Sequence, residues 1–273
     1  MTMPAPTTYA EMLPVHFEPP LVNPAPGGLY PNVLWTDVGL DEASRHLTGV
    51  EVRNVNFPGD AATGVWSVPW CGVPDLDGER KEGERGGDLP PFEPVVAWAF
   101  DSCDLTAPSR AEVEQRASQA LRLRESVMVA REFAERLKLD AADLGATGQV
   151  DNVVDALAGI EGEFAEANVL GYVHLSPEWL PVLVSAQLVA RSGTKWTTPG
   201  GHALVLDGGY RDGLGQTMIA TSAPLFGWRD QPQVRTSLDE RRNLYIAIAE
   251  RSVLVSYEEV IAAVEVTQPE PAP

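Results

Sequence analysis

The side chains that most often bind metals are spread thinly along this chain. Its four histidines are His16, His46, His174 and His202, and no two of them form a His-x-x-x-His pair. There is no Cys-x-x-Cys pair either. Because metal sites need several such ligands close together, we expect no metal site and interpret these residues as core or surface histidines.

One glycine-rich segment, residues 207–215, follows an expected strand and would suit a phosphate-binding loop. It lacks the Lys-Ser or Lys-Thr ending of such loops, and no convincing helix follows it, so a flexible loop is favoured. The carboxylates of Asp207 and Asp212 could serve a hydrolase, although an acidic chain provides many such pairs by chance. We therefore expect no catalytic residue and no cofactor, and keep an acidic cytoplasmic α/β hydrolytic enzyme as the weaker hypothesis.

Composition sets further bounds. The chain has 273 residues and a formal charge of -19, which argues against nucleic-acid binding over a broad surface but allows a container that grips DNA weakly. No stretch approaches the roughly 20 apolar residues that span a bilayer, and no basic segment followed by an apolar one begins the chain, so we expect neither a membrane protein nor a secreted one. The two cysteines, Cys71 and Cys103, are interpreted as reduced, partly buried thiols.

The elements that would position a site are most distinctive between residues 66 and 138. Residues 74–88 are charged and glycine-rich, and their one strongly apolar residue is Leu76, so this segment cannot bury itself and must project. An extended run rich in β-branched and aromatic residues follows at 92–101. This order is typical of a protein whose arms lie on neighbouring copies, and it favours a shell subunit over an enzyme.

A long amphipathic helix is predicted over residues 109–138. Ser109 and Glu112 have the spacing of a capping box, and Pro108 would provide a break just before it. Apolar residues then recur at spacings typical of one buried stripe: Val113, Ala117, Ala120, Leu121, Val127, Met128, Phe133 and Leu137. Taken alone, this helix would favour a long core helix of an α/β domain.

An arm and an α/β region flank this part of the chain. Residues 1–34 are proline-rich and predict an extended arm. Later elements are expected as helices at 41–47, 153–167 and 177–190, and as extended segments or strands at 50–57, 65–68, 168–175, 198–209, 218–223, 225–228 and 261–266. Residues 243–255 are too apolar throughout to be half-exposed, and predict one buried strand or two strands that turn near Glu250.

The order of proline-rich arm, projecting hairpin, strand, long helix, compact α/β region and late return strands resembles the major capsid protein of tailed bacteriophages. The Hong Kong 97 fold of that family is shared with encapsulins. Several phrases are similar to the family as well: Ala-Asn-Val-Leu at 167–170, Leu-Ser-Pro at 175–177, Trp-Thr-Thr-Pro-Gly-Gly at 196–201, and residues 245–259. The resemblance covers nearly the whole chain.

The resemblance implies an α+β fold of the Hong Kong 97 type, with an N-terminal arm, an extended loop hairpin, a peripheral domain with a long spine helix, and an axial α/β domain. The implied boundaries are the N-terminal arm at 1–34, the start of the peripheral domain at 35–59, the extended loop at 60–95, the peripheral domain with spine helix 109–138 at 96–149, the axial domain at 150–239, the return strands of the peripheral domain at 240–266, and a disordered tail at 267–273.

The function that the resemblance implies is mechanical. Hexamers and pentamers would close the icosahedral head that encloses the double-stranded DNA genome of a tailed phage, assembled in the host cytoplasm. An encapsulin-type nanocompartment shell is the alternative. Because the short arm leaves no room for a scaffolding segment, we expect a separate scaffolding protein or prior cleavage. The other expected partners are a portal, decoration proteins, and packaged DNA that is contacted weakly and non-specifically.

The residues expected to contact neighbouring subunits are charged residues of the extended loop, whose alternating signs suit charge complementarity. They are Asp75, Asp77, Glu79, Arg80, Lys81, Glu82, Glu84 and Arg85. The simpler interpretation of this segment is a solvated turn. Some members of the family join subunits through a lysine-to-asparagine isopeptide bond. Lys81 lies in the loop, but no asparagine can be matched to it, so we predict no crosslink.

Overall fold

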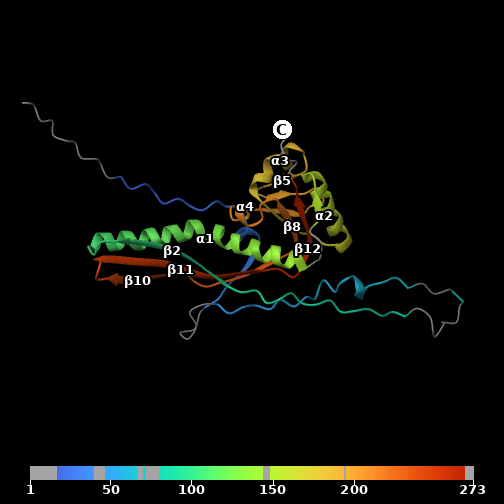
Figure 1. Cartoon of the computed structure of the whole chain (residues 1–273), viewed down its shortest axis with the longest axis horizontal. Helices are drawn as coiled ribbons and strands as arrows, with labels where there is room; N and C mark the ends of the chain where they lie inside the picture. The colour runs from blue at the N-terminus through green and yellow to red at the C-terminus, as the bar shows by residue number, and fades with distance from the viewer. Residues whose placement is uncertain are drawn as a thin grey trace, which may run out of the picture.

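A computed structural model describes residues 17–39, 47–66, 70–71, 80–143, 148–193 and 195–267. Two β-sheets and one long helix form the body, and a loop of two extended segments leaves it toward one side (Figure 1). The helices are α1 (Ala107–Asp143), α2 (Val153–Ala167), α3 (Leu180–Ser185) and α4 (Tyr210–Gly213), with the short 3-10 helices η1 (Tyr30–Asn32), η2 (Asp60–Ala62) and η3 (Pro177–Trp179).

A five-stranded sheet packs against α1. Its strands are β1 (Val33–Asp37), β2 (Val95–Cys103), β9 (Leu225–Arg229), β10 (Gln233–Asp239) and β11 (Leu244–Ser256). The central strand is β11, which pairs antiparallel with β2, β10 and β9, while β1 pairs parallel with β9. The predicted buried strand at 243–255 is therefore one strand, and the alternative of two strands is wrong.

The start of β11 is half-exposed, which corrects the expectation that both of its faces are covered. Tyr245, Ala247 and Ala249 are buried in the core beneath α1, whereas Ile248 on the opposite face is 36% exposed. On that outer face Ile248 pairs with Phe100 of β2, which is 52% exposed. An alternating strand buries only the face that its own chain covers.

The long helix α1 begins at Ala107, two residues earlier than predicted. Pro108 lies in the first turn of this helix. The N–H groups of that turn have no carbonyl partner within the helix, so proline costs no hydrogen bond there and does not break the helix. The predicted capping box at Ser109 is wrong, because Ser109 lies inside the first turn of the helix and not before it. Its hydroxyl accepts a hydrogen bond from the Thr106 hydroxyl (2.9 Å). The predicted stripe is buried at Val113, Ala117, Leu121, Phe133 and Leu137, and half-buried at Ala120, Val127 and Met128.

A seven-stranded sheet forms the other part of the body. In sheet order its strands are β3 (Gly148–Val150), β12 (Val260–Val266), β8 (Thr217–Ser222), β4 (Gly171–Leu175), β7 (Ala203–Leu206), β6 (Lys195–Thr197) and β5 (Ala190–Ser192). Helix α2 packs on this sheet and has the predicted bounds. The Asn152 side chain caps it by accepting the N–H groups of Val154 (3.0 Å) and Asp155 (2.9 Å).

Other expectations are met in part. The strands predicted around 168–175, 198–209, 218–223, 225–228 and 261–266 are present as β4, β7, β8, β9 and β12. The helix expected at 177–190 is only η3 and α3, since Pro177 and Pro181 start it irregularly and it ends at Ser185. Residues 50–57 are extended but form no strand, and most of the helix expected at 41–47 lies outside the described residues. None of the described helices is long and apolar enough to cross a membrane.

Candidate assembly interface

The extended loop consists of an outgoing segment, residues 47–66, and a returning segment, residues 80–94, that lie side by side (Figure 1). A bridge between Val50 and Phe92 closes its base, with hydrogen bonds of 2.9 and 2.8 Å. The paired segments thus begin earlier than residue 60, where the loop was predicted to start.

Backbone contacts at glycines hold the two segments together farther out. Gly86 N–H donates to Pro58 O (2.8 Å), and Glu84 N–H donates to Ala61 O (3.2 Å). A Cβ atom at position 86 would lie only 2.7 Å from Pro58 O, so a side chain there would force the segments apart. Glycine at position 86 therefore allows the two backbones to approach each other closely.

Five of the eight predicted contact residues can be located. Asp75, Asp77 and Glu79 lie outside the described residues, whereas Arg80, Lys81, Glu82, Glu84 and Arg85 are all exposed in the returning segment. Arg80 makes a loose ion pair with Glu82 (3.6 Å), and the Lys81 ammonium lies 4.7 Å from the centre of the Trp66 ring. The structure thus presents these charges to solvent without gathering them into one site.

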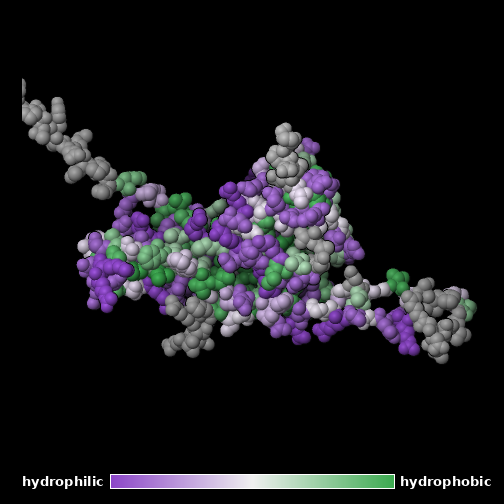
Figure 2. Space-filling view, viewed as in Figure 1, coloured by the Kyte–Doolittle hydropathy of each residue, from purple (hydrophilic) through white to green (hydrophobic). Residues whose placement is uncertain are grey.

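Apolar side chains share the end of the loop with these charges, which the prediction of charge complementarity alone did not include. Val65 is 96% exposed, Trp66 is 42% exposed and Trp70 is 99% exposed. Figure 2 shows apolar and charged surface next to each other toward this end of the loop. The signal was present in the sequence, because Val65, Trp66 and Trp70 precede the charged segment, but it was interpreted there as an extended segment at 65–68. Large apolar residues that project so far from the body are typical of a contact surface.

Two carboxylates hold the outgoing segment at the base of the loop. Glu258 accepts the N–H groups of Val55 (2.7 Å) and Asn56 (2.6 Å) and the Asn56 side-chain amide (2.6 Å). The Asn54 side-chain amide donates to Glu259 (2.7 Å). Both glutamates lie in the corner between β11 and β12, so the corner that joins the two sheets also fixes the loop.

The two glutamates differ in acidity. Burial disfavours the charge of Glu258, but the hydrogen bonds from Asn56 and Val55 outweigh it and lower its pKa below the usual value. Burial raises the pKa of Glu259 to about 6, and the neighbouring Glu258 and Asp140 carboxylates add to the rise. Glu259 therefore takes up a proton at a higher pH than Glu258 does.

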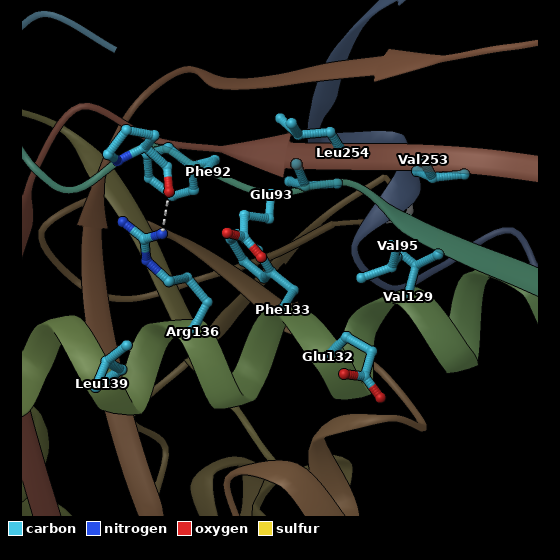
Figure 3. Close-up of a pocket in the computed structure, with 12 residues that line it drawn as sticks. Phe92, Glu93, Val95, Val129, Glu132, Phe133, Arg136, Leu139, Val253 and Leu254 are labelled. Atoms are coloured by element: carbon cyan, nitrogen blue, oxygen red, sulfur yellow. Dashed lines mark hydrogen bonds between the residues drawn. The ribbon is translucent and has the colours of Figure 1, made fainter. Parts of the chain in front are cut away.

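The returning segment is anchored by Arg136 of α1. Its guanidinium donates to the carbonyl oxygens of Pro91 (2.9 Å) and Pro90 (2.5 Å) and lies 4.1 Å from the centre of the Phe92 ring. Figure 3 shows Arg136 reaching from α1 toward Phe92. Asp140 accepts the Arg136 Nε–H (2.7 Å). Through this residue the returning segment is tied to the spine of the body.

Tyr257 completes this anchor. Its hydroxyl donates to Asp140 Oδ2 (2.6 Å), while Asp140 Oδ1 is buried and has no hydrogen-bond partner among the described residues. Burial, with the nearby Asp140 charge, raises the pKa of Tyr257 well above its usual value. The returning segment is thus held by Arg136 of α1, and Tyr257 of the β11–β12 corner supports this anchor through Asp140.

The end of the amino-terminal arm has its own anchors on the body. Gln119 of α1 donates to Val22 O (2.7 Å), and the Tyr30 hydroxyl donates to Glu125 (2.7 Å). Residues 17–28 contain no helix or strand, in agreement with the predicted extended arm, and β1 starts at Val33, near its predicted end. Residues 1–16 lie outside the described part.

The residues that could have served an enzyme have structural partners. Asp207 accepts the N–H groups of Leu29 (2.8 Å) and Gly209 (3.0 Å), and Asp212 pairs with Arg131 (2.7 Å), so the two carboxylates do not act as a pair. The glycine-rich segment contains helix α4, and it packs against α1 at Gly209, where a Cβ atom would overlap the backbone of that helix. This corrects its interpretation as a flexible loop.

The histidines and cysteines are also placed. The ring of His174 is buried, with Tyr210 OH and Thr221 Oγ1 each 2.9 Å from one of its nitrogens, and burial lowers its pKa to about 3. His202 stacks on Phe164 with ring centres 3.8 Å apart. His16 and His46 lie outside the described residues, among which no group of three metal-ligating side chains occurs. Cys71 and Cys103 are free and exposed, not partly buried as predicted.

Neither a family model nor a curated protein matches the sequence. Solved structures do match the fold. The mature capsid of bacteriophage PhiM1 aligns over 96% of this chain and 93% of its own, with a TM-score of 0.55 and 14% identity. A structure from Gordonia phage Cozz aligns over 95% of this chain and 92% of the phage chain, with a TM-score of 0.49 and 13% identity. A virus-like particle from Pyrococcus furiosus aligns over 69% of this chain and 82% of the particle's chain, with a TM-score of 0.42 and 8% identity. The chain therefore has an α+β fold of the Hong Kong 97 type, the fold of tailed-phage capsid proteins.

Proposed function

We propose that the chain is the major capsid protein of a tailed bacteriophage. Copies of it associate as hexamers and pentamers and close the icosahedral head around double-stranded DNA. The capsid fold supports this proposal, and one observation carries it: an extended loop, whose described residues are anchored to the body at its base, presents Val65, Trp66 and Trp70 to solvent on a highly charged chain. Large apolar side chains exposed together in this way are typical of a surface that another molecule covers.

The same proposal gives each part of the fold a role in the shell. The five-stranded sheet with α1 acts as the peripheral domain, the seven-stranded sheet with α2 acts as the axial domain around the fivefold and sixfold centres, and residues 60–95 belong to the loop that lies on a neighbour. The span 150–239 expected for the axial domain includes β9 and β10, which pair in the five-stranded sheet and so belong to the peripheral domain. Of the expected return strands at 240–266, β11 completes the five-stranded sheet of the peripheral domain, whereas β12 pairs in the seven-stranded sheet. A separate scaffolding protein, a portal and decoration proteins are the further partners, and the assembled chain resides in the virion.

Negative-stain electron microscopy of the purified protein tests this proposal, first with the protein expressed alone and then with its neighbouring genes. Closed polyhedral shells, tubes or rings of five and six subunits are the expected result. Small shells that hold a protein cargo in place of DNA would select the encapsulin-type alternative. A persistent monomer or dimer in both preparations would overturn the proposal and return attention to an enzyme.

A further inference from the structure

A pocket lies between the end of the amino-terminal arm, helix α1 and the five-stranded sheet. Arm residues between Pro24 and Pro31 form one wall, residues of α1 between Ser118 and Ser126 form the second, and residues of the sheet form the third. Its volume is about 440 Å³. A cavity of about 150 Å³ is large enough for benzene, and pockets of a few hundred Å³ are typical of small-molecule sites. The pocket therefore has room for a ligand larger than a single ring.

The walls of this pocket are small or apolar side chains. Ser118 of α1 and Ala249 of β11 lie on facing walls, and their small size leaves the space between them. Leu121 is buried beside it, but Val234, which pairs with Ala249 across the sheet and so shares its face, is 43% exposed. An apolar side chain left uncovered next to the core offers a surface on which the apolar part of a ligand is stabilised by burial.

One cation of the pocket has no anionic partner among the residues that the structure describes. The Arg122 guanidinium donates to the side-chain oxygens of Gln119 (3.3 Å) and Asn23, which are both neutral amides. Its charge is therefore not balanced by a carboxylate in that part of the chain. A guanidinium beside an apolar wall is suited to a carboxylate, which it can bind through two parallel hydrogen bonds.

The other charges of the pocket are already paired. Glu125 is 6% exposed, accepts the Tyr30 hydroxyl (2.7 Å) and pairs with Arg251 (3.4 Å). Burial, with the Glu125 charge, raises the pKa of Tyr30 far above its usual value, so the hydroxyl stays a donor to this carboxylate. Arg229, the third arginine of the lining, pairs with Asp37 (2.8 Å). Three arginines thus stand against two carboxylates, and the surplus charge favours an anion.

We propose that this pocket binds a small organic anion, a carboxylate joined to an apolar body of about ten carbon atoms. The carboxylate pairs with Arg122, and the apolar body packs on Leu121 and Val234. Because Pro24 and Ala25 form the wall that faces α1, the bound molecule fastens the arm to the helix. The pocket lies within one copy, so this inference does not rest on the proposed function.

Isothermal titration calorimetry with phenylbutyrate tests the site, and phenylbutyramide is the neutral compound of the same shape. We expect the carboxylate to bind with a dissociation constant of about 1 mM or below, and the amide at least roughly fivefold more weakly. Arg122→Gln should weaken the carboxylate to the level of the amide. Arg124→Gln, at an exposed arginine of α1 outside the pocket, should leave its affinity unchanged.

A blocking variant tests the place of binding. Ser118 is exposed on α1 and lines the pocket, so Ser118→Trp puts an indole into the space without changing the core. This variant should raise the dissociation constant of phenylbutyrate by roughly tenfold or more, because the apolar body then has no room. The comparison of carboxylate with amide uses the wild type, so it does not depend on how this variant folds.

Hydrogen exchange of the arm tests whether the ligand fastens it. If the arm must leave the body before the ligand is released, the amides of Ala25 and Gly27 should exchange about tenfold more slowly at ten times the dissociation constant. Residues 84 and 86 of the extended loop are the internal control and should not change. No binding of phenylbutyrate, equal binding of the amide, binding that Ser118→Trp leaves intact, or unchanged exchange in the arm would overturn this inference and leave the proposed function standing. A protein that forms no shells would do the reverse.

Discussion

The backbone N–H of Leu29 lies 2.8 Å from Asp207 Oδ2, so the end of the amino-terminal arm is bonded to the segment that follows β7. Leu29 is fully buried, and Asp207 is 5% exposed. Gly28 has a φ of +94°, and a Cβ atom there would overlap the same carboxylate. These contacts join the end of the arm to the body, in addition to the hydrogen bonds of Val22 and Tyr30 with α1.

Replacing Asp207 by alanine should lower the free energy of unfolding by about 1–3 kcal/mol, since it leaves the buried N–H of Leu29 without a partner. The matched control is Asp212→Ala, which removes an exposed ion pair and should cost less than about 1 kcal/mol. Urea denaturation followed by circular dichroism measures both. Equal losses in the two variants would contradict this role of Asp207.

Glu259→Gln should raise stability at pH 7 and lose its advantage in acid. The folded pKa of Glu259 is raised to about 6 from an ordinary 4.5, chiefly by burial, so the ionised form destabilises the native state above pH 6. As pH falls from 6 toward 4.5 the wild type takes up its proton and the penalty disappears. Because the group is only partly buried, we expect a gain of no more than about 1 kcal/mol at pH 7.

Melting temperatures of the wild type and Glu259→Gln between pH 4 and 8 check this sign. The two curves should converge below about pH 4.5. Glu258→Gln provides the contrast: because its folded pKa is lowered, that variant should be less stable than the wild type at pH 7, with the difference lost as pH falls through the folded pKa. A Glu259→Gln protein that is least stable near neutrality would refute the assignment.

Sequence pattern predicted the elements whose partners lie nearby in the chain. Helix α2 has its predicted bounds because Asn152 caps it and its apolar spacing is regular. The start of α1 was missed because a proline in the first turn looks the same in sequence as a proline that breaks the helix. The exposed face of Ile248 was missed because apolar spacing does not tell whether a face is covered by its own chain or by another.

The candidate interface could be predicted only in part for the same reason. The charge pattern around Lys81 indicated a projecting loop, and the loop does project. Its anchors could not be predicted, because Asn54 and Glu259 are 205 residues apart in sequence and Arg136 meets Pro91 from another element. Contacts of this kind depend on the fold and leave no periodic signal.

Gly86→Ala should loosen the extended loop without unfolding the body. The added Cβ atom would lie 2.7 Å from Pro58 O, so the hydrogen bond from residue 86 to Pro58 must lengthen. Amide hydrogen exchange at residues 84 and 86 should speed up by roughly fivefold, equivalent to about 1 kcal/mol. The control is Gly87→Ala, where a Cβ atom meets nothing within 4 Å and exchange should stay unchanged.

Reversing Arg80, Lys81 and Arg85 to glutamate should impair assembly while the monomer remains folded. All three side chains are exposed and contribute little to the stability of one copy, so the melting temperature should stay within about 2 °C of the wild type. Electron microscopy and size-exclusion chromatography measure the assembled fraction. Normal shells from this triple variant would remove the charges of the loop from the account of assembly.

Tyr257→Phe should be among the more damaging single changes in the described part of the chain, because it acts on a buried carboxylate that is already short of partners. Asp140 would keep only its bond to Arg136, while its Oδ1 atom has no hydrogen-bond partner among the described residues. We expect a loss of about 1–3 kcal/mol in the free energy of unfolding. Tyr245→Phe is the matched control, since that hydroxyl bonds an exposed glutamate, Glu114, at 2.5 Å and should cost about 1 kcal/mol or less. Because Asp140 orients Arg136, the Tyr257 variant should also speed hydrogen exchange at Phe92, whose N–H closes the loop base, and unchanged exchange there would separate Tyr257 from the anchor.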